Sequence, residues 1–435
     1  MNNHTEKAKI WLDRRFSKEI DGHYYSHQPL YGINSPYQEP NAILRFMRTY
    51  RLLQILGGLE FNSFLDVGGG EGYISALAKE LFSVTAHTTD LSEEACLRAG
   101  EIFDLQGIAT DATQLPFQDE SYDLVLCSEV IEHLSSPVFV ISELVRVAQK
   151  YVVITTAEFC PLGEFERMMR LFILDDSYPH AERNYFTYDD FRVLLGDEIL
   201  CSSQMSDLGG KLFQQFANKE LNQIQIKKII LDLTKTGKLD QNHIGVIVVA
   251  SKPGIKINSD PTDAHQWDED KGNKILDMLL EPRLRDNPSR RMARDFDTTL
   301  LDKLACPTCK NALLYRGDSL LCPQCNISYL VRDGVPLIYP VSDGRVLTST
   351  TSESVIAILS RGDLSRAAPI RSVLKKLHGN RPLHFSRIVR SASRLVLRAF
   401  WFIARPESIG KKVGRLIRLV TKKQLESENY GLFLD

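Results

Sequence analysis

The sequence predicts an α/β protein: a mainly parallel, doubly wound sheet followed by a small four-cysteine module and a basic helical tail. Short apolar runs alternate with amphipathic helical segments over residues 41–253, which is typical of parallel strands covered by helices on both faces. A glycine-rich stretch follows the first of these runs, and two C-x-x-C pairs lie within residues 306–325. A chain of 435 residues is long enough for two or three domains.

Residues 1–40 form a leader before the sheet. Apolar residues at helical spacing predict a helix within residues 4–20, and residues 21–40 are rich in Tyr, His and Pro. A second helix is expected over residues 41–56, because Gly57 and Gly58 end the periodic pattern.

The first predicted strand ends at Asp66 and leads into a glycine-rich turn. Glycines at positions 68, 70 and 72 have no Cβ, so the backbone of this turn can approach a ligand closely. The pattern is D-x-G-x-G-x-G, and Tyr73 occupies the third glycine position of the dinucleotide-binding G-x-G-x-x-G pattern. A tight strand-to-helix turn without a ligand is the alternative.

A second predicted strand ends at Asp90, 24 residues after Asp66. A β-α-β unit places a carboxylate at this distance for the hydroxyl groups of a ribose. Asp90 would also serve as an N-cap for the helix that follows Leu91, and both roles are compatible.

Three more motifs follow in order: D-A-x-x-L-P-F from Asp111, S-Y-D-L-V from Ser121 and E-V-I-E-H-L from Glu129. Together with the glycine-rich turn they resemble the class I S-adenosylmethionine-dependent methyltransferases, in particular their small-molecule, type 11-like branch. The resemblance covers about residues 41–253. It implies a Rossmann-like, seven-stranded sheet whose last strand, residues 244–250, runs antiparallel.

The resemblance also implies where S-adenosylmethionine binds. The implied cofactor-binding residues are Asp66, Gly68, Gly70, Gly72, Asp90, Leu91, Asp111, Ala112 and Glu129. In related methyltransferases a leader such as residues 1–40 lies over the cofactor cleft, so this leader is interpreted either as a lid or as a packed loop with aromatic anchors.

His133 is the candidate general base, because it follows the fourth strand at the mouth of the cleft in this fold. Glu132 shares that position and is an equal candidate. A capping or supporting histidine is the alternative for His133, and many related enzymes use no dedicated base.

The acceptor is expected to be an oxygen or nitrogen atom of a small molecule or saccharide, free or lipid-linked. One alternative is methylation of RNA or protein. Many relatives that methylate bases or glutamine carry an N-P-P-Y-type tetrapeptide, whereas residues 128–131 here read S-E-V-I. A second alternative is a non-enzymatic scaffold that binds S-adenosylmethionine.

Two C-x-x-C pairs, 12 residues apart, contain Cys306, Cys309, Cys322 and Cys325. Each pair places two thiolates on one tight turn, and two such turns give the tetrahedral set of four sulfur ligands that suits structural Zn²⁺. A redox motif needs only one pair, and two disulfides would suit a secreted chain. Four thiolates leave no open coordination position, so a catalytic zinc is not expected.

The residues around this cluster resemble the small zinc-ribbon proteins that bind and activate tRNA, rRNA and release-factor methyltransferases. The resemblance implies a zinc ribbon over residues 301–340, where the metal supplies folding energy to a module too small for a core of its own. Docking to the catalytic domain or to substrate is the expected role, and passive stabilisation is the alternative.

Residues 254–300 are polar and contain several prolines, so they are interpreted as a linker with one helix near residues 268–280. Residues 341–435 carry 18 Lys and Arg against 7 Asp and Glu. Arginines recur there at helical spacing opposite apolar residues: Arg387, Arg390, Arg394, Arg398 and Arg405. Two basic amphipathic helices predict contact with an anionic membrane surface through residues 385–425. Packing on the acidic body is an alternative, and RNA binding is less favoured because aromatic residues are few.

The chain begins with polar residues and has no run of 18 uncharged apolar residues, so neither a signal peptide nor a membrane-spanning helix is expected. Cys96, Cys127, Cys160 and Cys201 lie among apolar neighbours, which is typical of reduced thiols in cytosolic proteins. The expected location is the cytoplasm, with peripheral attachment to the inner face of the membrane.

Overall fold

The structure is a computed structural model. It describes residues 3–32, 35–37, 42–134, 136–157, 184, 186, 188–195, 199–206, 221–235, 243–255, 269–284 and 294–340. All of them belong to the first of two compact units, which comprises residues 1–167 and 176–361. The second unit and the predicted basic tail, residues 341–435, lie outside the described residues.

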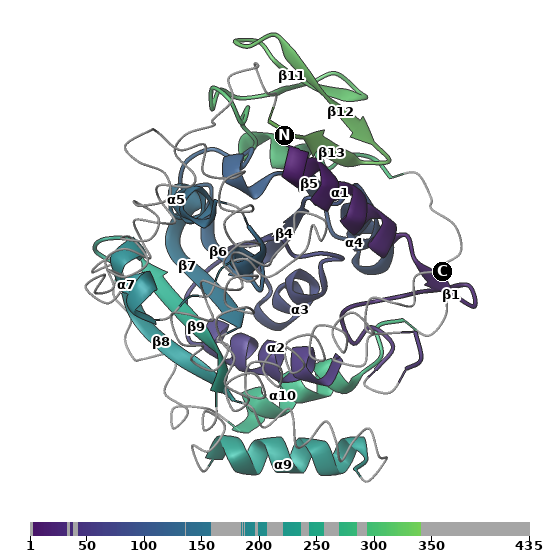
Figure 1. Cartoon of the computed structure of the whole chain (residues 1–435), viewed down its shortest axis with the longest axis vertical. Helices are drawn as coiled ribbons and strands as arrows, with labels where there is room; N and C mark the ends of the chain where they lie inside the picture. Colours follow the sequence, from purple (N-terminus) through teal and green to yellow (C-terminus); the bar gives the residue numbers. More distant parts are fainter. Residues whose placement is uncertain are drawn as a thin grey trace, which may run out of the picture. The chain divides into compact units, whose positions relative to one another are not determined.

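Seven strands form the predicted sheet in the order β5–β4–β3–β6–β7–β9–β8 (Figure 1). They are β3 (Ser63–Val67), β4 (Thr85–Asp90), β5 (Gly107–Thr110), β6 (Tyr122–Ser128), β7 (Ala148–Ala157), β8 (Ile199–Ser206) and β9 (His243–Ser251). Strands β3 to β7 are parallel, and β9 is antiparallel to both β7 and β8. The Rossmann-like α/β prediction is confirmed, including the antiparallel last strand.

The four-cysteine module continues this sheet. Its strands β10 (Leu314–Tyr315), β11 (Ser319–Cys322), β12 (Ile327–Arg332) and β13 (Val335–Ile338) are antiparallel to one another. Strand β13 pairs in parallel with β5, with Leu337 opposite Ala109 and Ile338 opposite Thr110. The Thr110 hydroxyl also donates a hydrogen bond to the Ile338 carbonyl, at 2.8 Å. The module therefore docks on the α/β domain, as expected, and covers an edge strand that would otherwise expose unpaired backbone groups.

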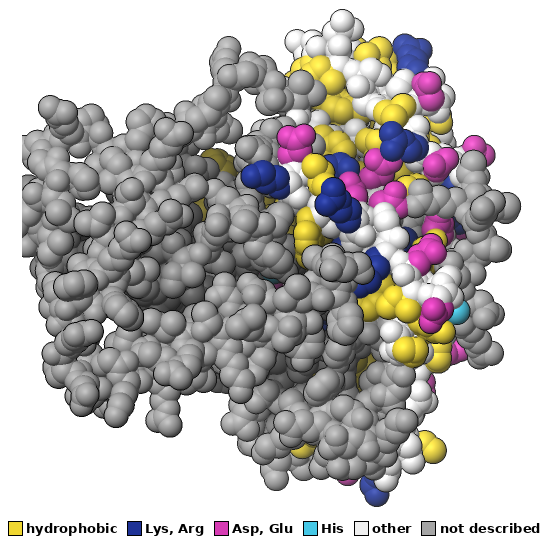
Figure 2. Space-filling view, turned by 45° about the vertical axis from the view of Figure 1, so that its right-hand side comes forward, with side chains coloured by type: hydrophobic (Ala, Val, Ile, Leu, Met, Phe, Trp, Pro, Cys, Tyr) yellow, Lys and Arg dark blue, Asp and Glu magenta, His cyan; other side chains and the backbone are white. Residues whose placement is uncertain are grey.

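Among the described residues, no helix combines the length and the apolar character that crossing a membrane requires. On the face drawn in Figure 2, basic and acidic side chains are interspersed, with hydrophobic side chains between them. The described residues therefore form no extended field of one charge on that face.

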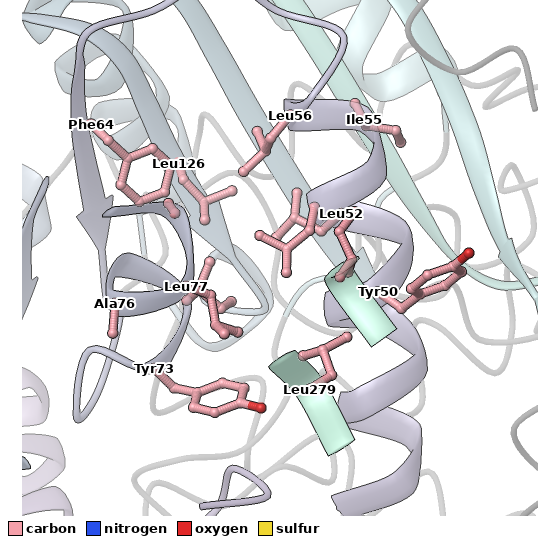
Figure 3. Packing of buried hydrophobic residues seen from close by; sticks show 14 of the residues in the cluster. Tyr50, Leu52, Ile55, Leu56, Phe64, Tyr73, Ala76, Leu77, Leu126 and Leu279 are labelled. Atoms are coloured by element: carbon pink, nitrogen blue, oxygen red, sulfur yellow. The ribbon is translucent and has the colours of Figure 1, made fainter. Parts of the chain in front are cut away.

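Helices cover both faces of the sheet, as the alternating sequence pattern predicted. One buried cluster gathers α2 (Ala42–Leu56), α3 (Tyr73–Phe82), α9 (Gln223–Lys235) and α10 (Glu269–Leu280) (Figure 3). The other gathers α5 (Pro137–Val147), α7 (Tyr188–Leu195) and the cysteine module. Successive strand residues point to opposite faces, so Phe64 belongs to the first cluster and Leu65 to the second.

Helix α10 falls in the segment that the sequence suggested was a linker. It begins within one residue of the predicted start, but its apolar side chains are part of the main core: Ile275, Leu276 and Leu279 are each at most 3% exposed. The polar residues and prolines on either side of the helix led to the linker interpretation. The pattern of a short amphipathic helix predicts that one face is buried, but it does not predict which part of the protein covers that face.

The leader begins with α1 (Asn3–Phe16), followed by the short strands β1 (Glu19–Ile20) and β2 (His23–Tyr24). It is anchored to α4 (Glu93–Phe103) by the buried side chain of Arg98. The Arg98 guanidinium donates hydrogen bonds to the carbonyls of Lys18 and Tyr25, at 3.1 and 3.2 Å, and lies 4.1 Å from the centre of the Tyr24 ring. A buried cation is thus satisfied almost entirely by the leader.

Ile338→Ala tests the contribution of the docked strand. Ile338 is fully buried at the junction of β13 and β5, and truncation of a buried isoleucine lowers the free energy of unfolding by about 2–5 kcal/mol. Leu330→Ala on the neighbouring strand is the matched control, because Leu330 is 46% exposed and its change should stay within about 0.5 kcal/mol. Equal losses in the two variants, measured by chemical denaturation, would contradict tight docking of β13.

Candidate functional site

The glycine-rich turn connects the carboxyl end of β3 to the start of α3. Gly68, Gly70 and Gly72 all have positive φ, between 57° and 78°. A Cβ on Gly68 would lie 2.4 Å from Cγ2 of Val130, and a Cβ on Gly70 would lie 3.2 Å from the Phe16 ring. Glycine is therefore required here both for backbone conformation and for space, with the leader packed directly over the turn.

Asp66 lies beneath this turn with its carboxylate buried. Among the described residues, neither carboxylate oxygen has a hydrogen-bond partner, and neither does the hydroxyl of neighbouring Thr88. Burial, together with the charge of Asp90, raises the pKa of Asp66 to about 7, and the nearby Ser75 hydroxyl, which donates to the His87 carbonyl at 3.4 Å, opposes this rise only in part. A buried carboxylate without a donor is costly, so this arrangement indicates a place where a ligand supplies the missing donors.

Asp90 ends β4 beside the same turn. Its two carboxylate oxygens accept hydrogen bonds from the backbone N–H groups of Gly70, at 3.0 Å, and Ser92, at 2.8 Å. Burial raises its pKa to about 6, although these two bonds favour the charged form. Asp90 was predicted to be the N-cap of α4, but the N-cap is Ser92, whose hydroxyl accepts a hydrogen bond from the Ala95 N–H. Asp90 instead fixes the turn before this cap, because its carboxylate accepts the hydrogen bond from the Ser92 N–H.

Glu71 is a further buried acid in the turn, and the sequence did not single it out. One carboxylate oxygen accepts a hydrogen bond from the Ser26 hydroxyl of the leader. The other has no hydrogen-bond partner within the described ranges. The leader therefore contacts the glycine-rich turn at Gly70 through Phe16 and at Glu71 through Ser26.

A second polar group lies where β6 and β7 end. Glu129 has φ 56°, a conformation that few residues other than glycine adopt. Its carboxylate accepts a hydrogen bond from the Thr155 hydroxyl, at 3.0 Å, and forms an ion pair with Arg48 of α2, at 2.6 Å. The strained backbone is thus held by side-chain contacts at the carboxyl edge of the sheet.

Glu132 and His133, the candidate bases, follow in the short helical turn Ile131–His133. Glu132 is buried and accepts a hydrogen bond from the Thr156 hydroxyl, at 3.1 Å. Burial and the charge of Glu129 raise its pKa well above the ordinary value. The His133 ring nitrogen Nε2 lies 3.9 Å from the Glu132 carboxylate. Asn184 fixes this turn, since its side chain donates to the carbonyls of Ile131 and Leu134.

Asp111 and Ala112 begin the loop that was expected to meet the adenine. The Asp111 carboxylate accepts hydrogen bonds from the N–H and hydroxyl of Thr113, at 2.9 and 2.7 Å, and so caps a single helical turn. The end of the loop, Leu115 to Phe117, packs into the core.

The cysteine module holds this loop by its backbone. Lys310, one residue after the first C-x-x-C pair, donates to the Leu115 carbonyl and forms an ion pair with Glu143 of α5, at 3.0 Å. The Ala305 N–H donates to the Pro116 carbonyl, at 2.8 Å. Residues far apart in the sequence thus fix the loop that follows β5.

Cys306, Cys309, Cys322 and Cys325 come together as predicted, with all four sulfur atoms within 4.8 Å of one another. The Cys309–Cys322 and Cys306–Cys325 sulfur separations are 3.5 and 4.0 Å. A tetrahedral zinc with Zn–S bonds of about 2.3 Å requires S–S separations of about 3.8 Å, so the cluster fits this metal.

Comparison with known families agrees with this geometry. Residues 65–154 match the family described as a methyltransferase domain. Residues 297–334 match the family described as Trm112p-like protein. The chain therefore contains a methyltransferase domain followed by a Trm112p-like domain. The methyltransferase match spans β3 to β7, and the Trm112p-like match spans the four cysteines.

Several curated relatives resemble parts of the chain. The ubiquinone biosynthesis O-methyltransferase of Nitrosomonas europaea is 34% identical over 106 residues, which are 22% of this chain and 43% of the relative. The malonyl-[acyl-carrier protein] O-methyltransferase of a Marinomonas species is 27% identical over 198 residues, 43% of this chain and 67% of the relative. A UPF0434 protein of Pseudomonas syringae is 44% identical over 55 residues, 12% of this chain and 88% of the relative.

The chain spans only part of other relatives, including 16% of the tetraacyldisaccharide 4'-kinase of Nitrosomonas europaea, to which it is 37% identical over 62 residues, 14% of this chain. Among solved structures, a geranyl diphosphate C-methyltransferase of Streptomyces coelicolor is 16% identical, with a TM-score of 0.38, covering 57% of this chain and 98% of that one. The Haloferax volcanii complex of the Trm112 methyltransferase activator with a methyltransferase is 14% identical, with a TM-score of 0.35, covering 50% and 94%. These structural likenesses are too low to bear on the function.

The structure brings most of the predicted residues of the methyltransferase domain to one edge of its sheet. Asp66, the three glycines and Asp90 lie at the ends of β3 and β4, and Glu129 and Glu132 lie after β6. Arg48, Thr155 and Asn184 also belong to this edge and were missed. Asn184 lies about 50 residues after the turn that it holds, and a single polar residue gave no signal of these contacts.

Asp66→Asn tests the buried carboxylate. An acid whose pKa is raised in the folded state binds its proton more tightly when folded, so its contribution to stability is lost as pH rises from about 4 to about 7. The amide variant removes this loss, on the order of 1.4 kcal/mol for each pH unit. We expect the ligand-free variant to be more stable than the parent at pH 8 in chemical denaturation.

Asp302→Asn is the matched control for this measurement, because Asp302 is exposed and precedes the cysteine cluster. Its unfolding free energy should follow that of the parent from pH 4 to pH 8. If Asp66→Asn also follows the parent over this range, the carboxylate is not destabilising in the folded protein.

The cysteine cluster predicts bound zinc. Elemental analysis of the purified full-length chain should find about one zinc per chain, and Cys322→Ser should lower that content and the thermal stability together. A fully folded protein without metal would contradict the zinc interpretation.

Proposed function

We propose that the protein transfers a methyl group from S-adenosylmethionine to an oxygen or nitrogen atom of a small-molecule or saccharide acceptor, free or lipid-linked. The observation that carries this proposal is the buried Asp66 carboxylate, whose oxygens accept no well-formed hydrogen bond among the described residues and which lies beneath three glycines of positive φ. Such an arrangement suits a ligand that brings N–H or O–H donors, and the match to a methyltransferase domain supports S-adenosylmethionine as that ligand.

Different residues at this edge would contact different portions of the cofactor. Asp66 and the turn of Gly68, Gly70 and Gly72 would surround its methionine portion, whereas Asp90 and Leu91 would lie at its ribose. Asp111 and Ala112 would meet the adenine, and Glu129 would lie on the methionine side, beside Val130. When bound, the cofactor supplies a methyl group on a positively charged sulfur, which is already a good leaving group.

The protein then has to align the acceptor and, where needed, remove its proton. Glu132 is suited to this task because it lies at the carboxyl edge of the sheet and burial raises its pKa. His133, 3.9 Å away, would receive the proton next or would act as the base itself. The leader would exclude water, since Phe16 and Ser26 pack on the glycine-rich turn.

Two relatives support an oxygen acceptor, because the Nitrosomonas and Marinomonas proteins are both named as O-methyltransferases. The Trm112p-like domain favours a second candidate function, methylation of RNA or protein. Residues 128–131 lack the N-P-P-Y-type tetrapeptide of many such enzymes, which argues against it. The third candidate is a scaffold that binds S-adenosylmethionine without turnover.

The proposal is tested with purified full-length protein, methyl-labelled S-adenosylmethionine and separated cell fractions. Label is expected in a small-molecule, glycan or lipid fraction. Label in RNA or protein would establish the second candidate, and binding without any transfer would establish the scaffold. No affinity for S-adenosylmethionine or its demethylated product would contradict all three.

Once an acceptor is found, Glu132→Gln should slow transfer roughly a hundredfold or more, because loss of a general base commonly has this effect. Glu120→Gln is the matched control. The Glu120 carboxylate is largely exposed, and its ion pair is with Lys252, which is not part of the candidate site. If Glu132→Gln retains full activity while His133→Asn loses it, the base is His133.

We also propose that residues 385–425 hold the protein on an anionic membrane surface, at the inner face of the membrane and on the cytoplasmic side. The basic stripe of this segment supports the proposal. Full-length protein should float with vesicles that contain anionic lipid, and a chain that ends at residue 384 should not. Failure of the full-length protein to float would contradict the membrane role and leave RNA or the acidic body as the partner of the tail.

A further inference from the structure

Tyr339 connects the Trm112p-like domain to the candidate ribose site. It immediately follows β13, and its side chain packs with Leu337 against a small buried cluster that includes Cys96 and Ala109. The Tyr339 hydroxyl donates a hydrogen bond to the carbonyl of Leu91, at 3.0 Å. Leu91 is the residue after Asp90, so a side chain 248 positions away holds the backbone beside the ribose acid.

The ring of Tyr339 also contacts the leader. The Lys9 ammonium of α1 lies 5.4 Å from the centre of the ring and forms an ion pair with Asp13, at 2.6 Å. Asp13 in turn accepts a hydrogen bond from the Ser92 hydroxyl, at 2.8 Å. The contacts thus run from the ring through α1 and return to the loop of residues 90–92.

Two further bonds close this arrangement on the glycine-rich turn. The Ser92 N–H donates to one oxygen of Asp90, and the other oxygen accepts from the Gly70 N–H. A second contact between the domains lies at the first residue of α4, where Arg332 of β12 forms an ion pair with Glu93, at 2.5 Å. Residues 90–93 are therefore held from the leader, from the glycine-rich turn and from the Trm112p-like domain.

We propose that Tyr339 is a positioning residue for the cofactor: it holds the loop of residues 90–92 so that Asp90 can accept the ribose hydroxyls. This inference rests on the proposed function, because it concerns the same site. Tyr339 acts through Leu91 and through Lys9, and it does not itself contact the reacting atoms.

The physical basis of this role is that Tyr339 fixes the conformation of a short loop. Residues 91 and 92 lie between a strand and a helix, and the Leu91 carbonyl would be free to rotate without a donor. Burial raises the pKa of Tyr339, so its hydroxyl remains a donor throughout the physiological range. Fixing the loop before the cofactor arrives spares the entropy of ordering it on binding.

Tyr339→Phe tests the hydroxyl, since it keeps the ring for the buried cluster and for Lys9. The dissociation constant for S-adenosylhomocysteine, measured by calorimetry on the full-length protein, should rise roughly three- to tenfold, the range expected for one neutral hydrogen bond. Tyr315→Phe is the matched control in the same domain, where the ring packs against Phe296. It should leave the dissociation constant unchanged.

A double-mutant cycle with Asp90→Asn separates positioning from a general loss of structure. Asp90→Asn alone should weaken binding, and adding Tyr339→Phe to it should cause little further loss, because Tyr339 acts through Asp90. A purely structural role would weaken both backgrounds by the same factor. Zinc content should match the parent in every variant.

Lys9→Met tests the second set of contacts to the same loop, those through Lys9 and Asp13. It replaces the first experiment if Tyr339→Phe does not fold. It removes the cation beside the ring and the partner of Asp13, and it should also raise the dissociation constant severalfold. If the parent binds S-adenosylhomocysteine and both variants bind it equally well, the positioning role is wrong. If the parent itself does not bind, the proposed function fails instead.

Discussion

The parallel pairing of β13 with β5 is the contact on which the rest of this structure depends. Four aligned residues join a cysteine-rich module to the edge of a seven-stranded sheet, and the buried Ile338 and the Thr110 hydroxyl reinforce the junction. Because the module cannot hold a core of its own, it gains an apolar surface to pack against. In return the sheet gains a cover for an exposed edge and donors for the loop that follows β5.

The same sheet carries several buried acidic side chains at one edge. Asp66, Asp90 and Glu132 are all buried at its carboxyl edge, and burial raises the pKa of each. Only Asp90 has both oxygens satisfied by backbone donors. Such an arrangement does not favour folding; it is understandable as a site that a ligand completes, and the surrounding core supplies the stability that the acids do not.

The docked module joins the site at two places. Lys310 and Ala305 hold the loop from Asp111 to Phe117 by its carbonyls, and Tyr339 holds the loop after Asp90. Metal in the cysteine cluster would therefore stabilise more than its own turns, since both loops that flank the candidate cofactor depend on the shape of the module. The leader completes this set through Lys9 and Asp13.

The sequence alone determined the features that rest on local pattern. Asp66 and its glycines, Asp90 at the end of a strand, and the four cysteines are each specified by near neighbours, so spacing was enough to predict them. The family resemblance added the number of strands and the antiparallel direction of the last one. Only the tertiary structure decided that β13 joins the sheet, that α10 enters the core and that Tyr339 meets Leu91. These contacts join residues that are far apart in the chain. Local periodicity predicts that a face is buried, but it does not predict which other face it packs against.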